Sequence, residues 1–470
     1  SDLAIMMAEY VSVPLYPNLN AETLERILEH SETKVLFVGK LDNYDSMKEG
    51  VSSDLICITY PFYSEDYKTW DDLTHNINPL LGNITRNEME LASIIYTSGT
   101  TGKPKGVMHK FYNFSFATTN AIKALSLGKE TFFSYLPLCH IAERLLVMMG
   151  SLYTGGRVSF AESLETFSDN LSEASPSVFL GVPRIWIKFQ QGILQKIPQN
   201  KLNILLSIPF VSSLIKKKIQ KGLGLSHAEH VFTGAAPTST SIIKWFERLG
   251  IKIQEAYAMT ENTCYSHVSF KSKIKIGSVG QPLPFCKVRL SEKNEILVKH
   301  KALMDGYYKD EVETRKTIID GWLHTGDEGY IDLSGFLKIT GRVKDIFKTQ
   351  KGKYVAPSPI EMKLVANKNL EQICVVGSGL PQPIALAILS ARGQNKAKED
   401  LIKSLERSMN IVNQKFDQHE RLHNIIILHD SWTIENQLLT PTMKIKRNAI
   451  EKKYKDAYSS WYEGPVINIL

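Results

Sequence analysis

The chain has 470 residues, a hydrophobic fraction of 43% and a charged fraction of 22%, which are ordinary values for a globular protein. This length predicts two or three domains with an ample core. The net charge of +7 suits anionic ligands but is too small to indicate nucleic-acid binding, and no recognition motif for nucleic acid is present.

The first 90 residues alternate short apolar runs with helical patterns. Runs at 34–38 and 55–59 are predicted to be strands, and residues 21–30 have the spacing of an amphipathic helix. Strands that alternate with helices indicate a parallel α/β sheet. We therefore expect an α/β fold for the large N-terminal part of the chain.

A loop rich in glycine, hydroxyl groups and lysine follows an apolar run that ends at Tyr96. Glycine lets the backbone approach a ligand closely, and N–H groups, hydroxyls and ammonium groups suit polyphosphate oxygens. The spacing is not that of the P-loop, because Pro104 follows the first lysine. The candidate phosphate contacts are Thr97, Ser98, Gly99, Thr100, Thr101, Gly102, Lys103 and Lys105.

Further along, a helix is predicted over 111–126 and buried strands over 178–182 and 230–233. Sites in open parallel sheets gather at the carboxyl ends of the strands. We therefore expect Thr97, Pro183 and Gly234 to lie near one another at such an edge.

Residues 203–222 combine apolar side chains with four lysines and have two interpretations. An amphipathic basic helix can lie on an anionic membrane surface, which would be a peripheral membrane contact. Amphipathic helices are also common in soluble proteins. We favour the second interpretation, a helix that packs on the core and has a solvated basic end.

The last part of the chain changes character. Short runs punctuated by turns predict an antiparallel β subdomain over about 276–343, with Asp327 between two strand-like runs. Residues 345–470 are predicted to form a small α+β domain with a long helix near 396–415.

The cysteines are five in number and widely separated, with no spacing typical of a metal site. Scattered cysteines favour reduced thiols in a cytoplasmic enzyme, and none is a plausible catalytic nucleophile. The cysteines are Cys57, Cys139, Cys264, Cys286 and Cys374.

Six motifs along the chain, taken together, resemble the adenylate-forming (AMP-binding) superfamily. They occur in the order that the family shows, at 97–106, 233–237, 257–261, 322–327, 341–345 and 441–444. Residues 136–144 and 351–357 are most similar to those of long-chain fatty acyl-CoA synthetases. The first residues resemble a segment well inside the family's N-terminal domain, so we expect the earliest part of that domain to be absent from this sequence.

The resemblance implies a large AMP-binding domain over 1–343 and a mobile C-terminal domain over 344–470, with a hinge at Lys344. It also implies a two-step reaction. A fatty acid first attacks the α-phosphate of ATP, which gives an acyl-adenylate and pyrophosphate. The thiol of CoA then attacks the acyl carbon, which gives a thioester and AMP.

For the first step, the resemblance assigns the reacting end of the site to four residues. Thr260 would donate a hydrogen bond to the α-phosphate, and Glu261 would bind Mg²⁺, a cation that prefers carboxylate and phosphate oxygens. Lys444 would reach the reacting carboxylate, with Lys446 as a rival for that role. His140 would lie at the carboxyl end of the acyl tunnel, or would be a structural histidine.

For the nucleoside and CoA, the resemblance implies a second set of contacts. Asp327 would accept ribose hydroxyls with support from Arg342, and Tyr257 would stack on adenine. Ala258 stands where the family usually has glycine, which affects the local backbone and the pocket width. The remaining contacts are Gly234, Ala235 and Ala236 near the base and Gly352 near the pantetheine of CoA.

Two alternatives to a fatty acid–CoA ligase stay open from the sequence. The acyl group could pass to a carrier-protein thiol instead of CoA. The chain could also be a non-catalytic nucleotide-binding member of the fold, although Glu261, Asp327 and Lys444 are all present.

Overall fold

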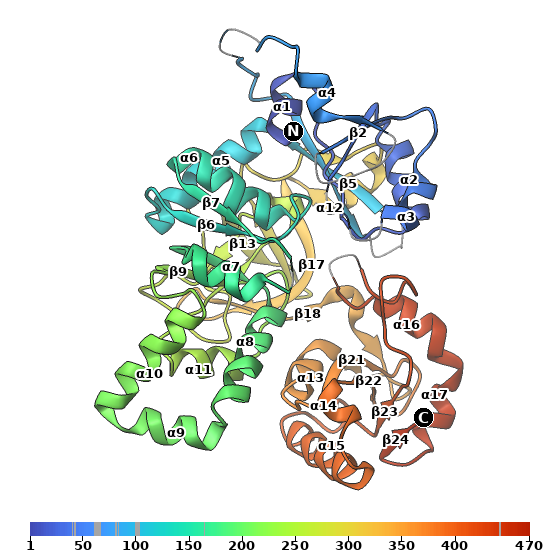
Figure 1. Ribbon diagram of the computed structural model, residues 1–470. Helices are drawn as coiled ribbons and strands as arrows, with labels where there is room; N and C mark the ends of the chain where they lie inside the picture. The colour runs from blue at the N-terminus through green and yellow to red at the C-terminus, as the bar shows by residue number, and fades with distance from the viewer. Residues whose placement is uncertain are drawn as a thin grey trace.

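The computed structural model describes residues 1–39, 41, 44–60, 67–79, 82, 84–98, 104–163, 165–440 and 443–470. Five predicted phosphate contacts therefore lie outside the described residues: Gly99, Thr100, Thr101, Gly102 and Lys103. The chain forms a large body from its N-terminal part, and the C-terminal residues form a smaller body below it (Figure 1). This arrangement agrees with the mixed α/β fold expected from the sequence.

A seven-stranded sheet is the centre of the large body. Its five neighbouring strands from β10 to β7 run parallel to one another. In spatial order the strands are β12 (Gln281–Pro282), β11 (His267–Val268), β10 (Gln254–Tyr257), β9 (His230–Thr233), β8 (Val178–Gly181), β6 (Thr131–Ser134) and β7 (Arg157–Phe160). The strands predicted at 178–182 and 230–233 are confirmed as β8 and β9.

Successive residues of these strands pack on opposite faces of the sheet, as strand geometry requires. Phe132, Val178 and Phe232 join a core shared with helix α5 (Phe111–Leu125). Their neighbours Phe133, Phe179 and Val231 join a second core, under the following helices. These are α7 (Phe167–Ala174), α8 (Pro183–Lys196), α9 (Gln199–Ser207), α10 (Pro209–Gly222) and α11 (Thr240–Glu247).

The first 90 residues form the predicted parallel sheet, with β1 (Val35–Val38), β2 (Ile56–Thr59) and β3 (Lys68–Thr69) in that order. The helix predicted over 21–30 is α2 (Ala21–His30), whose Asn20 side chain accepts a hydrogen bond from Thr23 N–H. The other helices of the large body are α1 (Asp2–Met7), α3 (Tyr44–Met47), α4 (Trp70–Thr74), α6 (Gly150–Thr154) and α12 (Glu311–Thr317).

The strand before the phosphate loop is not part of the seven-stranded sheet. β4 (Leu91–Ser98) pairs antiparallel with β5 (Pro104–Lys110), and β5 pairs with β15 (Gly306–Tyr307). Thr97 therefore lies opposite Lys105 at the end of a hairpin. The expectation that Thr97 ends a strand of the same parallel sheet as Gly234 is wrong, because the β4 backbone groups pair with β5.

An antiparallel sheet lies within the predicted range, from Lys287 to Arg342, although β12 and β15 in that range pair with other sheets. Its strands are β13 (Lys287–Leu290), β14 (Glu295–Lys299), β16 (Ile318–Ile319), β17 (Trp322–Ile331) and β18 (Leu337–Arg342). Asp327 lies inside β17, not between two strands, and is paired in register with Arg342 of β18. Gly326, the residue before it, has a left-handed backbone with φ of +71°, and the strand continues through it.

The C-terminal residues form a four-stranded sheet with β21 (Leu370–Val376), β22 (Ile384–Leu389), β23 (Ile425–Ile427) and β24 (Ile467–Ile469). The long helix predicted near 396–415 is α15 (Lys398–Asn413), which packs on this sheet through Leu401, Leu405 and Met409. A short hairpin, β19 (Phe347–Lys348) and β20 (Tyr354–Val355), precedes the sheet. The other helices here are α13 (Pro357–Leu364), α14 (Ala391–Gln394), α16 (Arg447–Tyr454) and α17 (Tyr458–Tyr462).

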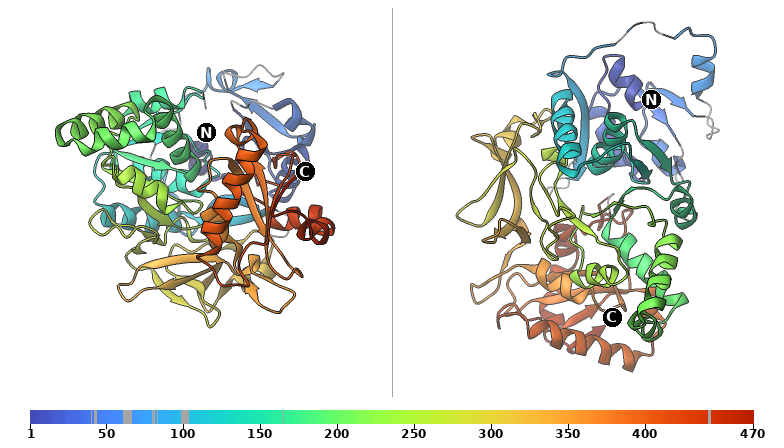
Figure 2. Two further views of the ribbon diagram at one scale, coloured as in Figure 1. Left: turned by 90° about the horizontal axis from the view of Figure 1, so that it is seen from below. Right: turned by 90° about the vertical axis from the view of Figure 1, so that its left-hand side faces the viewer.

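The segment at 203–222 is divided between two helices, α9 and α10, which meet near Ile208. These helices extend from one side of the large body (Figure 2). Leu202 and Ile219 pack on the core as expected, but a second set of apolar side chains is exposed. The favoured interpretation, a core-packing helix with a solvated basic end, therefore agrees with these core contacts and with the exposed lysines, but it did not include the exposed apolar side chains. Within the described residues, no helix combines the length and the apolar character needed to cross a bilayer.

Candidate active site

Asp327 is held by one partner on each carboxylate oxygen. Arg342 Nε lies 2.9 Å from Oδ1, and the Tyr257 hydroxyl donates a hydrogen bond of 2.7 Å to Oδ2. The Asp327 side chain is buried, whereas the Arg342 side chain is 46% exposed. Strand pairing of β17 with β18, and the end of β10 nearby, bring these three predicted site residues together.

The electrostatics of this triad keep Arg342 charged and Tyr257 neutral. The Asp327 carboxylate raises the pKa of Arg342. Burial, and then the Asp327 charge, raise the pKa of Tyr257 well above its usual range. Tyr257 is therefore a neutral hydroxyl donor. Each Asp327 oxygen accepts one contact and keeps a second lone pair, so the carboxylate can still accept a ribose hydroxyl.

Tyr257 is only 8% exposed and is part of the core. Its hydroxyl orients Asp327, which is a role that the sequence did not reveal. Stacking of its ring on adenine stays a prediction. Ala258 does not have a left-handed backbone, so its methyl group causes no strain of that kind.

Glu261 lies in a short 3₁₀ turn, η3 (Thr260–Asn262), directly after β10. One carboxylate oxygen, Oε1, accepts a hydrogen bond of 3.0 Å from the Tyr307 hydroxyl. The Glu261 carbonyl accepts another from Met304 N–H at 2.9 Å. Thr260 precedes it in the same turn, so the two predicted reacting-end residues are adjacent and fixed to β15.

The residues present fit a magnesium ion that is held mainly by phosphates. Within the described part of the chain, no group of three or more His, Cys, Asp or Glu side chains is arranged to hold a metal. Mg²⁺ in nucleotide sites is commonly bound through one or two carboxylates, with phosphates and water completing its shell. Glu261 supplies one such carboxylate, with Oε2 not engaged by Tyr307.

Lys105, at the base of the phosphate loop, has protein partners. Its ammonium forms an ion pair with Glu313 of α12 and lies 5.1 Å from the centre of the Tyr307 ring. The bond from Lys105 lowers the pKa of Glu313. Because Tyr307 also contacts Glu261, a continuous set of contacts links the end of the phosphate loop to the predicted magnesium ligand.

Lys444 approaches this site from the C-terminal body. Burial, and then the positive charge of Arg342, lower the pKa of Lys444, while Asp327 and Glu261 act in the opposite direction. The ammonium is thus within electrostatic reach of three predicted site residues. The residue keeps solvent-accessible surface, while the neighbouring protein excludes enough water from the ammonium to lower its pKa.

His140 is the fourth group on this side. Burial, and then the charge of Lys444, lower the pKa of His140 to about 4. Its Nδ1 accepts a weak hydrogen bond of 3.3 Å from Ala142 N–H. A neutral imidazole with Nδ1 as acceptor carries its proton on Nε2, so His140 presents an N–H donor at neutral pH.

The segment that carries His140 is tightly anchored. Arg144 is fully buried and pairs with Asp2, with Arg144 Nη2 lying 2.6 Å from Oδ1. Glu143 is buried as well, and burial raises the pKa of Glu143 to about 7. The side chains of Val178 and Phe179 in β8 pack in the two cores on opposite faces of the sheet. The position of His140 at the end of an acyl tunnel stays a prediction.

The loop after β9 presents backbone to solvent where nucleoside contacts are predicted. Ala235 and Ala236 are exposed, and Ala235 has a left-handed φ of +65°. A Cβ on Gly234 would lie 3.1 Å from the carbonyl oxygen of Ala256, which is tighter than normal packing. Gly352 turns the β19–β20 hairpin with φ of +77°. Its predicted contact with CoA is untested.

Lys446, the rival of Lys444, lies elsewhere. It lines a small groove of about 120 Å³ that is shared with Thr97, Tyr96 and residues of α2. Burial lowers its pKa. The two lysines therefore face different parts of the molecule, Lys444 the nucleotide triad and Lys446 the base of the phosphate loop.

Sequence reasoning missed Tyr307 and Glu313. The sequence feature that could have indicated them is Gly306, which precedes two tyrosines. In the structure Gly306 has a φ of +138°. A Cβ on Gly306 would lie 2.9 Å from Thr314 Cγ2, so the strand and α12 pack too closely for a larger residue. A glycine beside aromatic residues thus marked a close approach of two elements.

Comparison with protein-family models gives two matches that together cover most of the chain. Residues 1–308 match the AMP-binding enzyme family, and residues 344–465 match the AMP-binding enzyme C-terminal domain.

Among curated relatives, long-chain-fatty-acid–CoA ligase FadD15 of Mycobacterium bovis is 27% identical over 98% of this chain and 85% of its own length. Long-chain-fatty-acid–CoA ligase ACSBG2 of Homo sapiens is 27% identical over 97% of this chain and 81% of its own length.

Solved structures with the same fold include two adenylating proteins. An anthranilate CoA ligase in complex with anthranoyl-AMP aligns with a TM-score of 0.78 and 20% identity, covering 98% of this chain and 85% of the other. The adenylation domain of a carboxylate reductase from Mycobacterium chelonae aligns with a TM-score of 0.82 and 20% identity, covering 98% and 78%. At this identity the similarity establishes the fold.

Proposed function

The chain belongs to the AMP-binding enzyme family, and from this premise we propose that it activates a long-chain fatty acid with ATP and transfers the acyl group to CoA. The observation that carries the proposal is the position of Lys444. A lysine 117 positions after Asp327 in the chain lies within electrostatic reach of Asp327, Arg342 and Glu261.

In the first step the chain must bring two anions together, the fatty-acid carboxylate and the α-phosphate. Lys444 supplies a positive charge where the attacking carboxylate and the phosphate meet, which stabilises the charge that develops there. Thr260 and the Nε2–H of His140 are neutral donors for the same oxygens. Since His140 is neutral, it adds no second cation to repel Lys444.

Asp327 and Arg342 position the nucleoside during this step. The Asp327 carboxylate, already oriented by Tyr257, accepts the ribose hydroxyls, and the exposed part of Arg342 faces the nucleotide. A donor and acceptor set that is fixed before binding loses little freedom when the ligand arrives. When bound, Mg²⁺ would be held by Glu261 and would neutralise phosphate charge.

In the second step the acyl-adenylate must meet a thiol. We propose that residues 344–470 rotate about Lys344, which withdraws Lys444 and brings the Gly352 hairpin toward the acyl group. CoA carries its own nucleophile, so no protein thiol is required. The printed names of the curated relatives support CoA as the acceptor and a long-chain acid as the substrate.

The test is pyrophosphate exchange into ATP by the full chain, with acids of increasing length from acetate to palmitate and with benzoate for comparison. We expect exchange with long-chain acids and none with benzoate, followed by palmitoyl-CoA formation when CoA is added. Product formation with acyl carrier protein but not with CoA would mean that the acyl acceptor is a carrier-protein thiol. Tight AMP binding without exchange for any acid would favour a non-catalytic nucleotide-binding protein.

A further inference from the structure

We propose that the α9–α10 corner docks this protein on an anionic lipid membrane. The corner is the part of the chain from Gln199 to Gly222, where α9 ends and α10 begins. It lies at the lower left of the large body in Figure 1, on the other side from β17 and β18, and extends outward in the left view of Figure 2.

The outer face of the corner exposes large apolar side chains close together in sequence. Phe210 is 78% exposed, Ile204 is 63% exposed and Leu214 is 56% exposed. Ile208, between the two helices, is exposed as well. Scattered apolar residues on a surface need no explanation, but four within 11 residues form a patch typical of a protein or membrane contact.

The same face of α10 becomes cationic one turn further on. Phe210, Leu214, Lys217, Lys218 and Lys221 follow helical spacing along one stripe, and all are exposed. The opposite face is buried through Ser212 and Ile219, so the orientation of the helix is fixed by the core. α10 therefore presents an apolar tip and a lysine cluster to one surface.

The charge of this region distinguishes it from the rest of the chain. Residues 174–228 contain eight Lys and Arg and no Asp or Glu. The charge of +8 on this segment exceeds the net charge of +7 of the whole chain, so the rest of the chain is close to neutral. A surface that is both apolar and uniformly cationic complements anionic lipid headgroups above an acyl interior.

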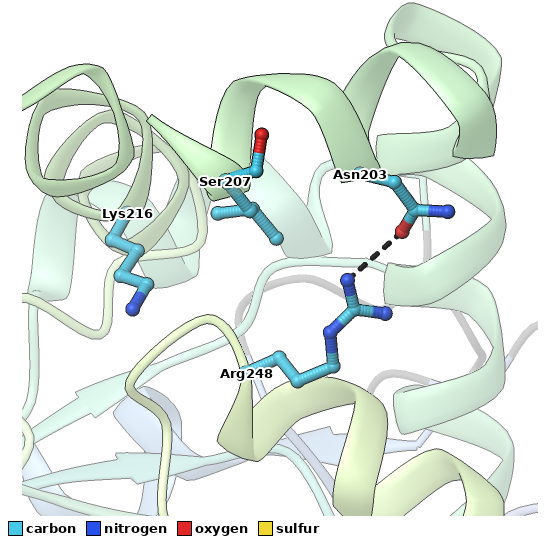
Figure 3. A pocket seen from close by; sticks show the side chains of 5 residues that line it. Asn203, Ser207, Lys216 and Arg248 are labelled. Carbon is cyan, nitrogen blue, oxygen red and sulfur yellow. Dashed lines mark hydrogen bonds between the residues drawn. The ribbon is translucent and has the colours of Figure 1, made fainter. Parts of the chain in front are cut away.

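A pocket beside the corner is suited to a headgroup phosphate. It has a volume of about 350 Å³ and is lined by Asn203, Leu206, Ser207, Lys216 and Arg248. Figure 3 shows Lys216 of α10 and Arg248, just after α11, on two sides of it. Arg248 is held by a hydrogen bond of 2.9 Å to the Asn203 carbonyl oxygen Oδ1. Two cations that face one pocket bind a phosphate better than either alone.

Other occupants fit the surface less well. A second copy of the chain meeting this face in a symmetric dimer would place the Lys217–Lys221 cluster near its own equivalent, and the like charges would repel. Nucleic acid would satisfy the lysines but would leave Phe210 and Ile204 exposed. A lipid surface satisfies both parts, because apolar side chains enter the acyl boundary while lysines stay at the headgroups.

The test is co-sedimentation of the full chain with vesicles of phosphatidylcholine alone and of phosphatidylcholine with phosphatidylglycerol at three to one. We expect binding to the anionic vesicles that weakens with salt. The variant Lys217→Gln/Lys218→Gln/Lys221→Gln should bind them about 100-fold more weakly, at roughly fivefold for each lysine removed. Phe210→Ser/Leu214→Ser should lose at least about tenfold through lost apolar burial.

The matched control is Lys452→Gln/Lys453→Gln/Lys455→Gln, which removes three exposed lysines from the C-terminal body. It should keep vesicle binding, and an equal loss in this variant would overturn the proposal in favour of general charge attraction. Failure of the parent chain to bind anionic vesicles, or dimerisation that depends on Phe210, would also overturn it. Pyrophosphate exchange with a water-soluble acid should be unchanged in all three variants. A failure of membrane docking can therefore be distinguished from a failure of the proposed activity.

Discussion

The nucleotide triad and the lysine that faces it are held in opposite ways. Asp327, Arg342 and Tyr257 are joined by short contacts between paired strands and a neighbouring strand end. Lys444 reaches the same place from the loop before α16 in the C-terminal body and remains exposed to water. The difference indicates that the nucleotide side is assembled by folding, whereas the lysine is delivered by the position of the C-terminal body. Changes on the two sides should therefore have different consequences.

The largest effect is expected from Lys444→Ala. Removal of one charge that stabilises the transition state should lower the rate of acyl-adenylate formation by about 100-fold or more. The midpoint of thermal unfolding should stay the same, because the side chain is exposed. Thioester formation from added acyl-adenylate and CoA should be retained, since the second step does not use this lysine.

Lys452→Ala, on the exposed side of α16, is the matched control and should leave both half-reactions intact. Lys446→Ala tests the alternative assignment, in which Lys446 and not Lys444 acts in adenylation. If Lys446→Ala abolishes adenylation while Lys444→Ala retains it, the assignment of the lysine is wrong and the comparison between the two sides fails.

The free energy of unfolding should depend on pH through Glu255, by about 3 kcal/mol. This residue lies in β10, the strand that also carries Tyr257. Burial raises the pKa of this carboxyl to about 7 from its usual 4.5, although Gly277 N–H donates a hydrogen bond to it at 2.9 Å. Between pH 4.5 and 7 the unfolded chain loses this proton while the folded chain keeps it. The Glu255 contribution to stability is therefore complete at low pH and is lost as the pH rises through 7.

Glu255→Gln should remove this dependence. Urea unfolding of the variant and the parent should show the variant gaining relative stability at pH 8 compared with pH 5. Glu247→Gln, an exposed change nearby, should give the same difference at both pH values. A constant difference for Glu255→Gln as well would mean that this carboxyl is already ionised at pH 5.

Asp327→Asn should affect both stability and nucleotide binding. It removes a charged acceptor and leaves Arg342 without its counterion, and we expect a loss of about 1–3 kcal/mol in the free energy of unfolding. AMP affinity, measured by calorimetry, should fall together with stability. Asp305→Asn breaks the more exposed ion pair with Lys110 and should cost less than about 1 kcal/mol. Equal losses in the two variants would contradict the idea of a preassembled triad.

The smallest effect is expected from Glu313→Gln. Its partner Lys105 loses a neutralising charge at the base of the phosphate loop, so the attraction for phosphate should rise. We expect the KM for ATP to fall by about 2- to 5-fold, in line with the modest strength of a partly exposed ion pair. Glu311→Gln on the same helix pairs with exposed Arg315 and should leave KM unchanged. A rise in KM would mean that Glu313 positions Lys105 for binding.

Most secondary structure was predictable because it is encoded by local patterns. The helix at 21–30, the strand at 230–233 and the antiparallel run from 287 to 342 follow from the periodicity of apolar residues and from turn chemistry. The phosphate-loop strand was assigned to the wrong sheet, because an apolar run does not specify its pairing partner. Asp327 was placed between two strands because the sequence does not show that the strand continues through Gly326, which adopts a positive φ inside β17.

The sequence by itself determined the order of the motifs and, through them, the family and the residue types that the chemistry requires. Tertiary structure alone decided which of these residues meet. Lys105 and Glu313 are 208 positions apart, and Tyr257 and Asp327 are 70 apart. Contacts at such separations depend on strand register and on the placement of whole sheets, which no local pattern contains. The same reason explains the α9–α10 corner: its helical spacing is visible in the sequence, but only the fold shows which face is buried and which is left to solvent.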